Sequence, residues 1–191
     1  TKDFIAPSGM KFNQANFEIG ASFGAINGMN ILAGELPDTI LSDFLELQHL
    51  FCVNLHVTPL DQITALKFVK TKLTAVESMK IDEQKKASKA GYDPDILPPA
   101  IKMYITDLEK LLDDLNSKNE RLFHISITIR NYAKNKKDLG LQLELLKRIC
   151  QKNNCTLMPC DYLQEDYLSS RLPLGVNKIQ VSREMNTSGI A

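Results

Sequence analysis

Two segments of this chain alternate between apolar and polar side chains, and they constrain the fold more than any other feature. In residues 51–58 (FCVNLHVT) and 121–130 (RLFHISITIR), every second side chain over most of the segment is apolar. A period of two predicts β-strands that have one apolar and one polar face. We therefore expect helices to cover one side of the sheet and the other side to stay polar.

Helical patterns fill the sequence between these two strands. Thr58, Pro59 and Asp61 provide a cap, a proline at the first helical position and an early carboxylate, which together predict a helix start. Apolar residues then recur at spacings of three and four, and the pattern returns after a polar stretch at 81–99. The two expected stripes are Ile63, Leu66, Val69, Leu73 and Val76, then Ile101, Tyr104, Leu108, Leu111 and Leu115. Two such segments predict an antiparallel helical hairpin over about residues 60–118.

The remaining elements complete a mixed α and β pattern. They are a strand pair in 15–34 with a bend or bulge at Gly28, a helix from Pro37 to about His49, a helix capped by Asn135, a strand at 155–159 and a short helix at 161–173. Two strand–helix–strand units in tandem predict an α+β fold of the ferredoxin-like split βαβ type. Here the fold carries a long helical-hairpin insertion and an extra N-terminal strand. We expect residues 1–160 to form one α/β domain, and 161–191 to form a short helix and a linker.

The charge balance argues against several classes of protein. The 191 residues contain 23 basic and 23 acidic side chains, so there is no basic surplus for gripping nucleic acid. No apolar run approaches the roughly 20 residues that cross a bilayer, and no signal peptide is visible. Four cysteines in a chain of this size are typical of reduced thiols in a cytoplasmic protein.

The polar face of the two alternating strands offers the candidate site residues. His56 and His124 are expected on the same face, which suggests a metal site or a proton switch. No carboxylate or thiolate stands at ligand spacing, however, and a half-exposed polar sheet face is the alternative interpretation. The same face carries no aromatic side chain at the outward positions, which argues against base stacking by an RNA-binding sheet.

No motif of a known catalytic site is present in the chain. The sequence contains no phosphate-binding G-x-x-x-x-G-K-[ST] loop, no G-x-S-x-G and no H-E-x-x-H. Cys150, Cys155 and Cys160 do not match zinc-ligand spacing, so structural thiols are the better interpretation. We therefore expect no catalytic residues and no cofactor in this chain.

An ordered set of short motifs resembles the N-terminal region of conjugative-transfer ATPases. These are motor proteins of type IV secretion, in the TraE-like branch carried by conjugative plasmids and transposons. The motifs, in order, are DFIAPSGMKF (3–12), FEIG (17–20), VTPLD (57–61), ERLFHISITI (120–129), LPLGVN (172–177) and REMNTSGIA (183–191). The resemblance extends over nearly the whole chain.

The resemblance implies a non-catalytic assembly domain whose parent protein energises DNA transfer through a secretion channel. ATP and Mg²⁺ would then belong to a C-terminal motor domain beyond Ala191, and residues 182–191 would be the linker to it. The implied partners are that ATPase domain and membrane proteins of the channel, with self-association as a further contact. No direct nucleic-acid contact is expected, and the protein would lie in the cytoplasm, peripherally at the inner face of the membrane. The alternative is a stand-alone ferredoxin-like domain that senses a ligand or metal through His56 and His124.

Overall fold

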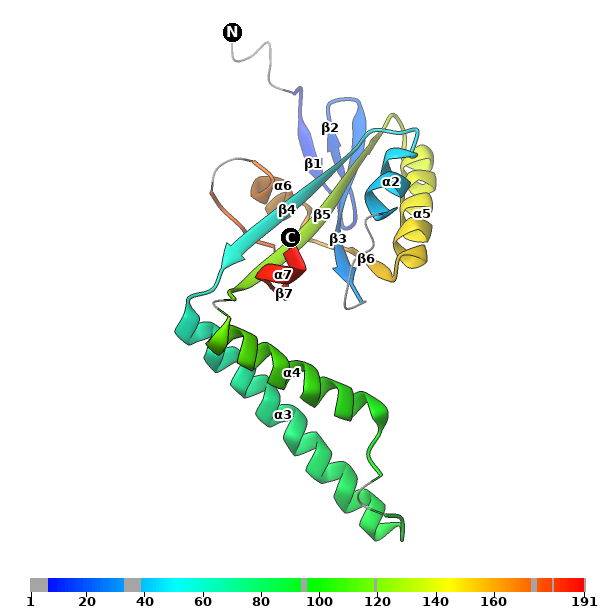
Figure 1. Ribbon diagram of the computed structural model, residues 1–191. Coiled ribbons are helices and arrows are strands. Elements are labelled where there is room, and N and C mark those ends of the chain that lie inside the picture. Colours follow the sequence, from blue (N-terminus) through cyan, green and yellow to red (C-terminus); the bar gives the residue numbers. More distant parts are fainter. Residues whose placement is uncertain are drawn as a thin grey trace. The chain divides into compact units, whose positions relative to one another are not determined.

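The computed structural model describes residues 7–32, 39–93, 96–118, 120–172, 175–179 and 181–190 (Figure 1). The chain divides into two compact units. Unit 1 contains Thr1–Val57 and Ile125–Arg183, and unit 2 contains Thr58–His124 and Glu184–Ala191. Each unit is described by itself below.

Within its described residues, unit 1 contains a sheet and three helices. Its elements are β1 (Met10–Phe12), β2 (Phe17–Ile19), β3 (Ser22–Ile31), α2 (Thr39–Leu45), α5 (Lys136–Lys152), β6 (Cys155–Pro159), α6 (Gln164–Ser170) and most of β4 (Phe51–Pro59) and β5 (Leu122–Ala133). The strand order is β1-β2-β3-β5-β4, and β6 also pairs with β3. The pairs β1–β2, β2–β3, β3–β5 and β3–β6 are antiparallel. The predicted α+β class is thereby confirmed.

The start of the sheet differs in detail from the sequence prediction. Residues 10–12 form β1, and the strand pair predicted within 15–34 is present as β2 and β3, which pair antiparallel. Gly28 was expected at a bend, but it lies in unbroken register between Thr128 and Met158. Gly24 is the glycine that the packing requires. It pairs with the buried Phe17, and a Cβ atom there would lie 2.3 Å from the ring of Phe17.

Both faces of the sheet are covered, whereas we expected helices on one face only. On one face α5 packs on β3 and β6, and α2 packs on α5 (Figure 1). On the other face α6 and the chain after it contribute Tyr167 and Ile179 to a cluster with Phe17, Ile26 and Cys160. The expectation of an open polar face was therefore wrong. The cause is the chain's own helix α6, which the sequence analysis had placed with the linker.

The apolar row of β4 shows the opposite error. We expected Val53, Leu55 and Val57 to lie under the helices, yet their exposed fractions are 38%, 55% and 42%. β4 stands at the end of the strand order, while α5 packs on β3 and β6. The apolar alternation correctly indicated a strand, but it did not indicate where the helical layer ends.

Unit 2 contains the predicted helical hairpin, formed by α3 (Gln62–Lys89) and α4 (Pro99–Ser117). Its buried cluster consists of Ala65, Val69, Leu115 and Leu122. The helix cap is Asp61, whose side chain accepts a hydrogen bond from the Thr64 N–H at 3.0 Å. Thr58 and Pro59 still belong to β4, so the predicted cap was three residues early.

The two predicted stripes of the hairpin are only partly buried. Ile63 and Tyr104, which we placed in them, have exposed fractions of 81% and 59%. The end of the chain is also more regular than expected. Residues 183–190 form β7 (Arg183–Asn186), which pairs with β5, and the short helix α7 (Thr187–Ile190). The Thr187 N–H donates to the Arg121 carbonyl at 3.0 Å, which anchors this segment beside β5.

Candidate functional site

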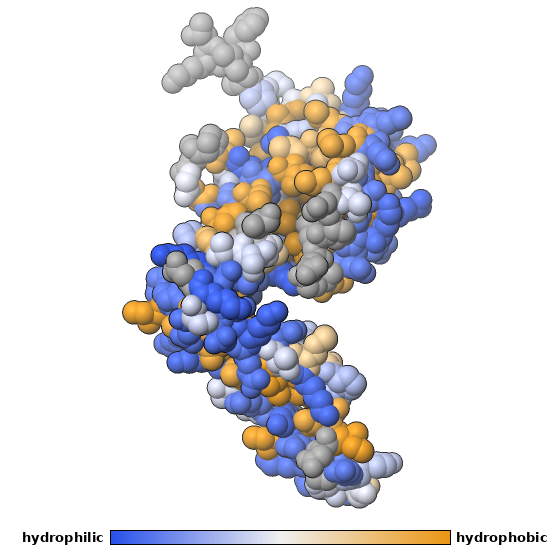
Figure 2. All heavy atoms as spheres, in the orientation of Figure 1, coloured by the Kyte–Doolittle hydropathy of each residue, from blue (hydrophilic) through white to orange (hydrophobic). Residues whose placement is uncertain are grey.

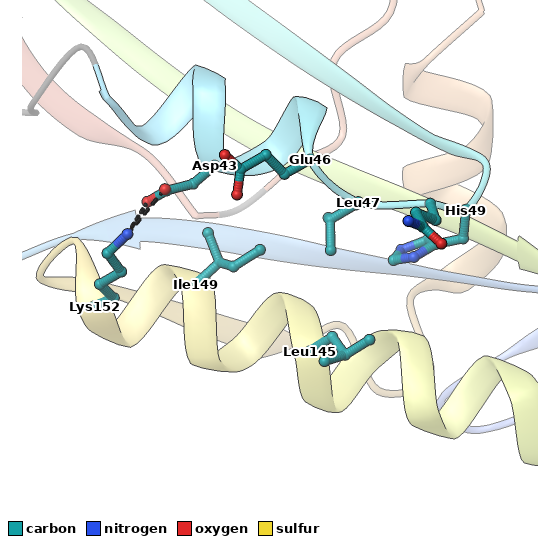
Figure 3. A pocket seen from close by; sticks show the side chains of 8 residues that line it. Asp43, Glu46, Leu47, His49, Leu145, Ile149 and Lys152 are labelled. Atoms are coloured by element: carbon teal, nitrogen blue, oxygen red, sulfur yellow. Dashed lines mark hydrogen bonds and ion pairs between the residues drawn. The ribbon is translucent and has the colours of Figure 1, made fainter.

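A groove between α2 and α5 is the candidate site of unit 1 (Figure 3). Its volume is about 550 Å³. Leu47, Leu145 and Ile149 give it an apolar floor, and polar side chains stand at its ends. The lining residues are Asp43, Glu46, Leu47, Gln48, His49, Leu145, Ile149 and Lys152.

Asp43 fixes one end of the groove. Its carboxylate accepts a hydrogen bond from Asn153 Nδ2 at 2.9 Å and an ion-pair contact from Lys152 Nζ at 2.9 Å (Figure 3 shows the ion pair). Asn153 is buried and also donates to the Ile149 carbonyl at 3.0 Å. The hydrogen bond from Asn153, and after it the one from Lys152, lowers the pKa of the Asp43 carboxyl. A fixed negative charge therefore ties α2 to the C-terminal end of α5.

His49 stands at the other end of the groove. Its Nε2 atom lies 3.0 Å from Nδ2 of the buried Asn131, and its ring lies 6.1 Å from the ring of Phe51. Burial lowers the pKa of the imidazole below its ordinary value of 6.5. A neutral ring accepts the hydrogen bond from Asn131 through Nε2. The groove thus has a charged end at Asp43 and a neutral polar end at His49.

The lowered pKa of His49 predicts a pH dependence of stability. Between the folded and unfolded pKa values the folded chain binds fewer protons, so the free energy of unfolding falls as the pH falls through this window. We expect urea denaturation from about pH 7.5 to about pH 5.5 to show a steeper loss in the wild type than in His49→Gln. The hydrogen bonds from Asn153 and Lys152 hold the pKa of the Asp43 carboxyl in the same groove below its ordinary value, which moves its titration further from this range. Equal slopes for the two proteins would contradict the prediction.

The two histidines singled out from the sequence fall in different units. In unit 1, His56 Nε2 lies 2.7 Å from Asn54 Nδ2 on the same strand. In unit 2, His124 Nδ1 lies 3.5 Å from Glu184 Oε1, and its ring meets the ring of Phe68 edge-on. Across the described ranges, no group of three His, Cys, Asp or Glu side chains is placed to hold a metal ion. Each histidine therefore has local polar or aromatic neighbours within its own unit.

Three of the four cysteines lie in the interior of unit 1. Cys150, Cys155 and Cys160 are buried and unpaired, whereas Cys52 is exposed. Burial raises the pKa of the Cys150 thiol to about 12, and it raises the pKa values of Cys155 and Cys160 as well. These three thiols stay protonated at neutral pH and pack as small apolar groups.

The buried side chain of Gln164 and the half-buried side chain of Arg171 connect α6 to the sheet, and sequence reasoning missed both. Gln164 accepts from the Ile26 N–H at 2.9 Å, and donates to the carbonyls of Ile26 at 2.9 Å and Cys160 at 3.0 Å. The Arg171 guanidinium donates hydrogen bonds to the carbonyl oxygen of Thr128 at 3.1 Å and to the Thr128 hydroxyl at 2.8 Å. It also donates to the carbonyl oxygen of Cys52 at 2.7 Å. Both residues stand in a polar stretch of sequence, where nothing distinguishes them from surface residues. No local signal could have found them.

The arrangement in the groove is suited to recognition. An open groove with an apolar floor and fixed polar ends can take an apolar side chain of a partner and hydrogen-bond the atoms beside it. Neither a family model nor a characterised protein matches the chain. Within the described part of the chain, every helix is too short or too polar to cross a lipid bilayer.

Proposed function

We propose that this chain is the non-catalytic assembly domain of an ATPase that energises conjugative DNA transfer through a type IV secretion channel. The ordered sequence motifs resemble that family. The structural observation that carries the proposal is the α2–α5 groove, an open recognition surface with an apolar floor. ATP and Mg²⁺ would be bound by the motor domain of the parent protein, and this chain would stay in the cytoplasm at the inner face of the membrane.

We propose further that the sheet of unit 1 is a ferredoxin-like core with additions. β6 pairs with β3, β3 with β5, and β5 neighbours β4. In chain order these are the fourth, first, third and second strands of the two strand–helix–strand units, which is the arrangement of a split βαβ fold. β1 and β2 would then be the N-terminal addition, and α3 with α4 the insertion.

The occupant that we propose for the groove is an apolar segment of the parent's own ATPase domain. The sheet face that was expected to stay open and polar carries α6 and the chain after it, which supports the groove as the contact surface. Leu145 is the side chain to test, because it lines the groove and is 47% exposed. A glutamate there would place a charge on the apolar floor without opening a cavity in the core.

The matched control stands one turn away on the same helix. Leu141 is 59% exposed and is not part of the groove lining. We expect Leu145→Glu to weaken binding of the chain to the separately purified ATPase domain by about tenfold or more, as for an interface anchor. Leu141→Glu should bind like the wild type, and calorimetric titration measures both affinities.

The proposal fails if the wild-type chain binds neither the ATPase domain nor any purified channel protein. It also fails if both glutamate variants bind equally well. A thermal shift caused by a divalent metal and removed by His56→Ala would instead favour the ligand-sensing alternative.

A further inference from the structure

The edge strand β4 has an outer side on which no described strand pairs with its backbone groups, and the Val53 carbonyl there accepts only a long contact from the Cys52 thiol at 3.8 Å. Among the described strands, β5 is its one neighbour in the sheet. The Tyr132 N–H donates to the Leu50 carbonyl at 3.3 Å, and the Leu60 N–H donates to the Leu122 carbonyl at 2.9 Å. In an antiparallel ladder the N–H and C=O of one residue point to the same side, and this side alternates along the strand. The even-numbered residues therefore pair with β5, and residues 51, 53, 55 and 57 offer their backbone groups outward.

Three of these residues, Val53, Leu55 and Val57, also form an exposed apolar row of side chains, whereas Phe51 lies beside Phe44 of α2. Val53, Leu55 and Val57 are 38%, 55% and 42% exposed, and Figure 2 shows apolar atoms gathered over β4 and β5 on this side of unit 1. A row of this kind beside free backbone groups is the combination that recruits another strand.

Protection against such pairing is weak in β4. Natural edge strands usually carry a lysine, another charge, a proline or a bulge. Residues 51–60 contain no Asp, Glu, Lys or Arg, and the proline, Pro59, stands at the last position of the strand. The middle of the edge is therefore open to a partner.

We propose that β4 pairs edge to edge with β4 of a second copy of this chain, antiparallel, about a two-fold axis at Leu55. In this register Leu55 exchanges both backbone hydrogen bonds with its own copy, and Val53 exchanges both with Val57. The apolar rows of the two copies then fall on the same face of a continuous sheet. This inference does not depend on the proposed function.

The identity of the partner follows from the self-complementarity of the strand. On the second face of the paired strands, Asn54 lies opposite His56 of the second copy, and an amide with an imidazole is the pair that already forms within one strand at 2.7 Å. From Val53 to Val57 every position meets a residue of its own chemical class, and no like charges oppose each other. A strand of unrelated sequence would lack this match.

A charge at the symmetry axis tests the interface directly. In Leu55→Lys the two new ammonium groups face each other across the axis, whereas Leu141→Lys places the same charge on an equally exposed leucine of α5. We expect sedimentation velocity to show dimers for the wild type and for Leu141→Lys, and monomers for Leu55→Lys. Circular dichroism checks that all three proteins are folded.

A disulfide at the axis tests the register. Directly opposed residues of a hydrogen-bonded pair have Cα atoms about 5.5 Å apart, which a disulfide can span. The experiment starts from a Cys52→Ser variant, because the other three cysteines are buried and Cys52 is the exposed one. In this variant we expect an added Leu55→Cys to form a covalent dimer under mild oxidation, and an added Leu141→Cys to stay monomeric. The proposal would be overturned if the wild type were monomeric at every concentration. It would also be overturned if Leu55→Lys still formed dimers, or if the two cysteine variants cross-linked equally.

Discussion

Replacing Gln164 with leucine is expected to lower the free energy of unfolding by about 4 kcal/mol, because each buried polar group left without a partner costs about 1–3 kcal/mol. The side chain is 1% exposed and serves both backbone groups of Ile26 as well as the Cys160 carbonyl. Leucine has a similar volume but can neither donate nor accept. The loss would be measured by urea denaturation of the whole chain.

The position of Gln164 in the sheet explains why the effect is large. The pairing of β2 with β3 ends at Gly24, and the pairing of β6 with β3 begins at Asn27. Ile26 lies in the gap, and the glutamine amide takes the place of a missing strand residue there. Because the amide has one acceptor and two donors, it matches the N–H and the two carbonyls around it.

Two further variants separate the hydrogen bonds from side-chain size. Gln151→Leu makes the same change at an exposed position of α5 and should alter the unfolding free energy by less than about 0.5 kcal/mol. Gln164→Glu should be unstable at neutral pH and should recover part of the loss as the pH falls, because a protonated carboxyl can again donate to a carbonyl. Equal losses in Gln164→Leu and Gln151→Leu would show that the buried amide is not required.

Replacing Arg171 with methionine is expected to cost about 3 kcal/mol, since hydrogen bonds from charged donors contribute about 1.5–3 kcal/mol each and methionine recovers part of the packing. The guanidinium joins α6 to Thr128 on β5 and to Cys52 on β4. Burial lowers the pKa of this guanidinium, although arginine stays charged at any physiological pH. Urea denaturation and amide hydrogen exchange of β4 would measure the effect.

The control for this prediction is Arg148→Met, at an exposed position of α5, which should change stability little. Arg171→Lys should fall between wild type and Arg171→Met, because an ammonium group cannot reach both strands with the planar fork of arginine. A lysine variant as stable as the wild type would show that the forked geometry is not needed. If Arg171→Met were as stable as the wild type, the guanidinium would not be needed to hold α6 on the sheet.

Local periodicity determined which elements this chain forms. The alternation in 51–58 and 121–130 correctly indicated β4 and β5, and the spacing of three and four correctly indicated α3, α4 and α5. Asn135 caps α5 as expected, accepting a hydrogen bond from the Asp138 N–H at 2.8 Å. These features depend on neighbours within a few residues in sequence, so the sequence alone contains them.

Only the tertiary structure decided which surfaces are buried. Gln164 and Arg171 resemble surface residues in sequence, yet long-range packing places them against the backbone of β3, β4 and β5. Leu55 resembles a core residue, yet its strand lies at the edge of the sheet and stays exposed. The spacing of apolar residues, every second residue in a strand or every 3.6 residues in a helix, indicates which side chains share a face. Whether a face meets protein or water depends on elements between 43 and 138 residues away in the contacts of Arg171 and Gln164, and the local pattern carries no information about them.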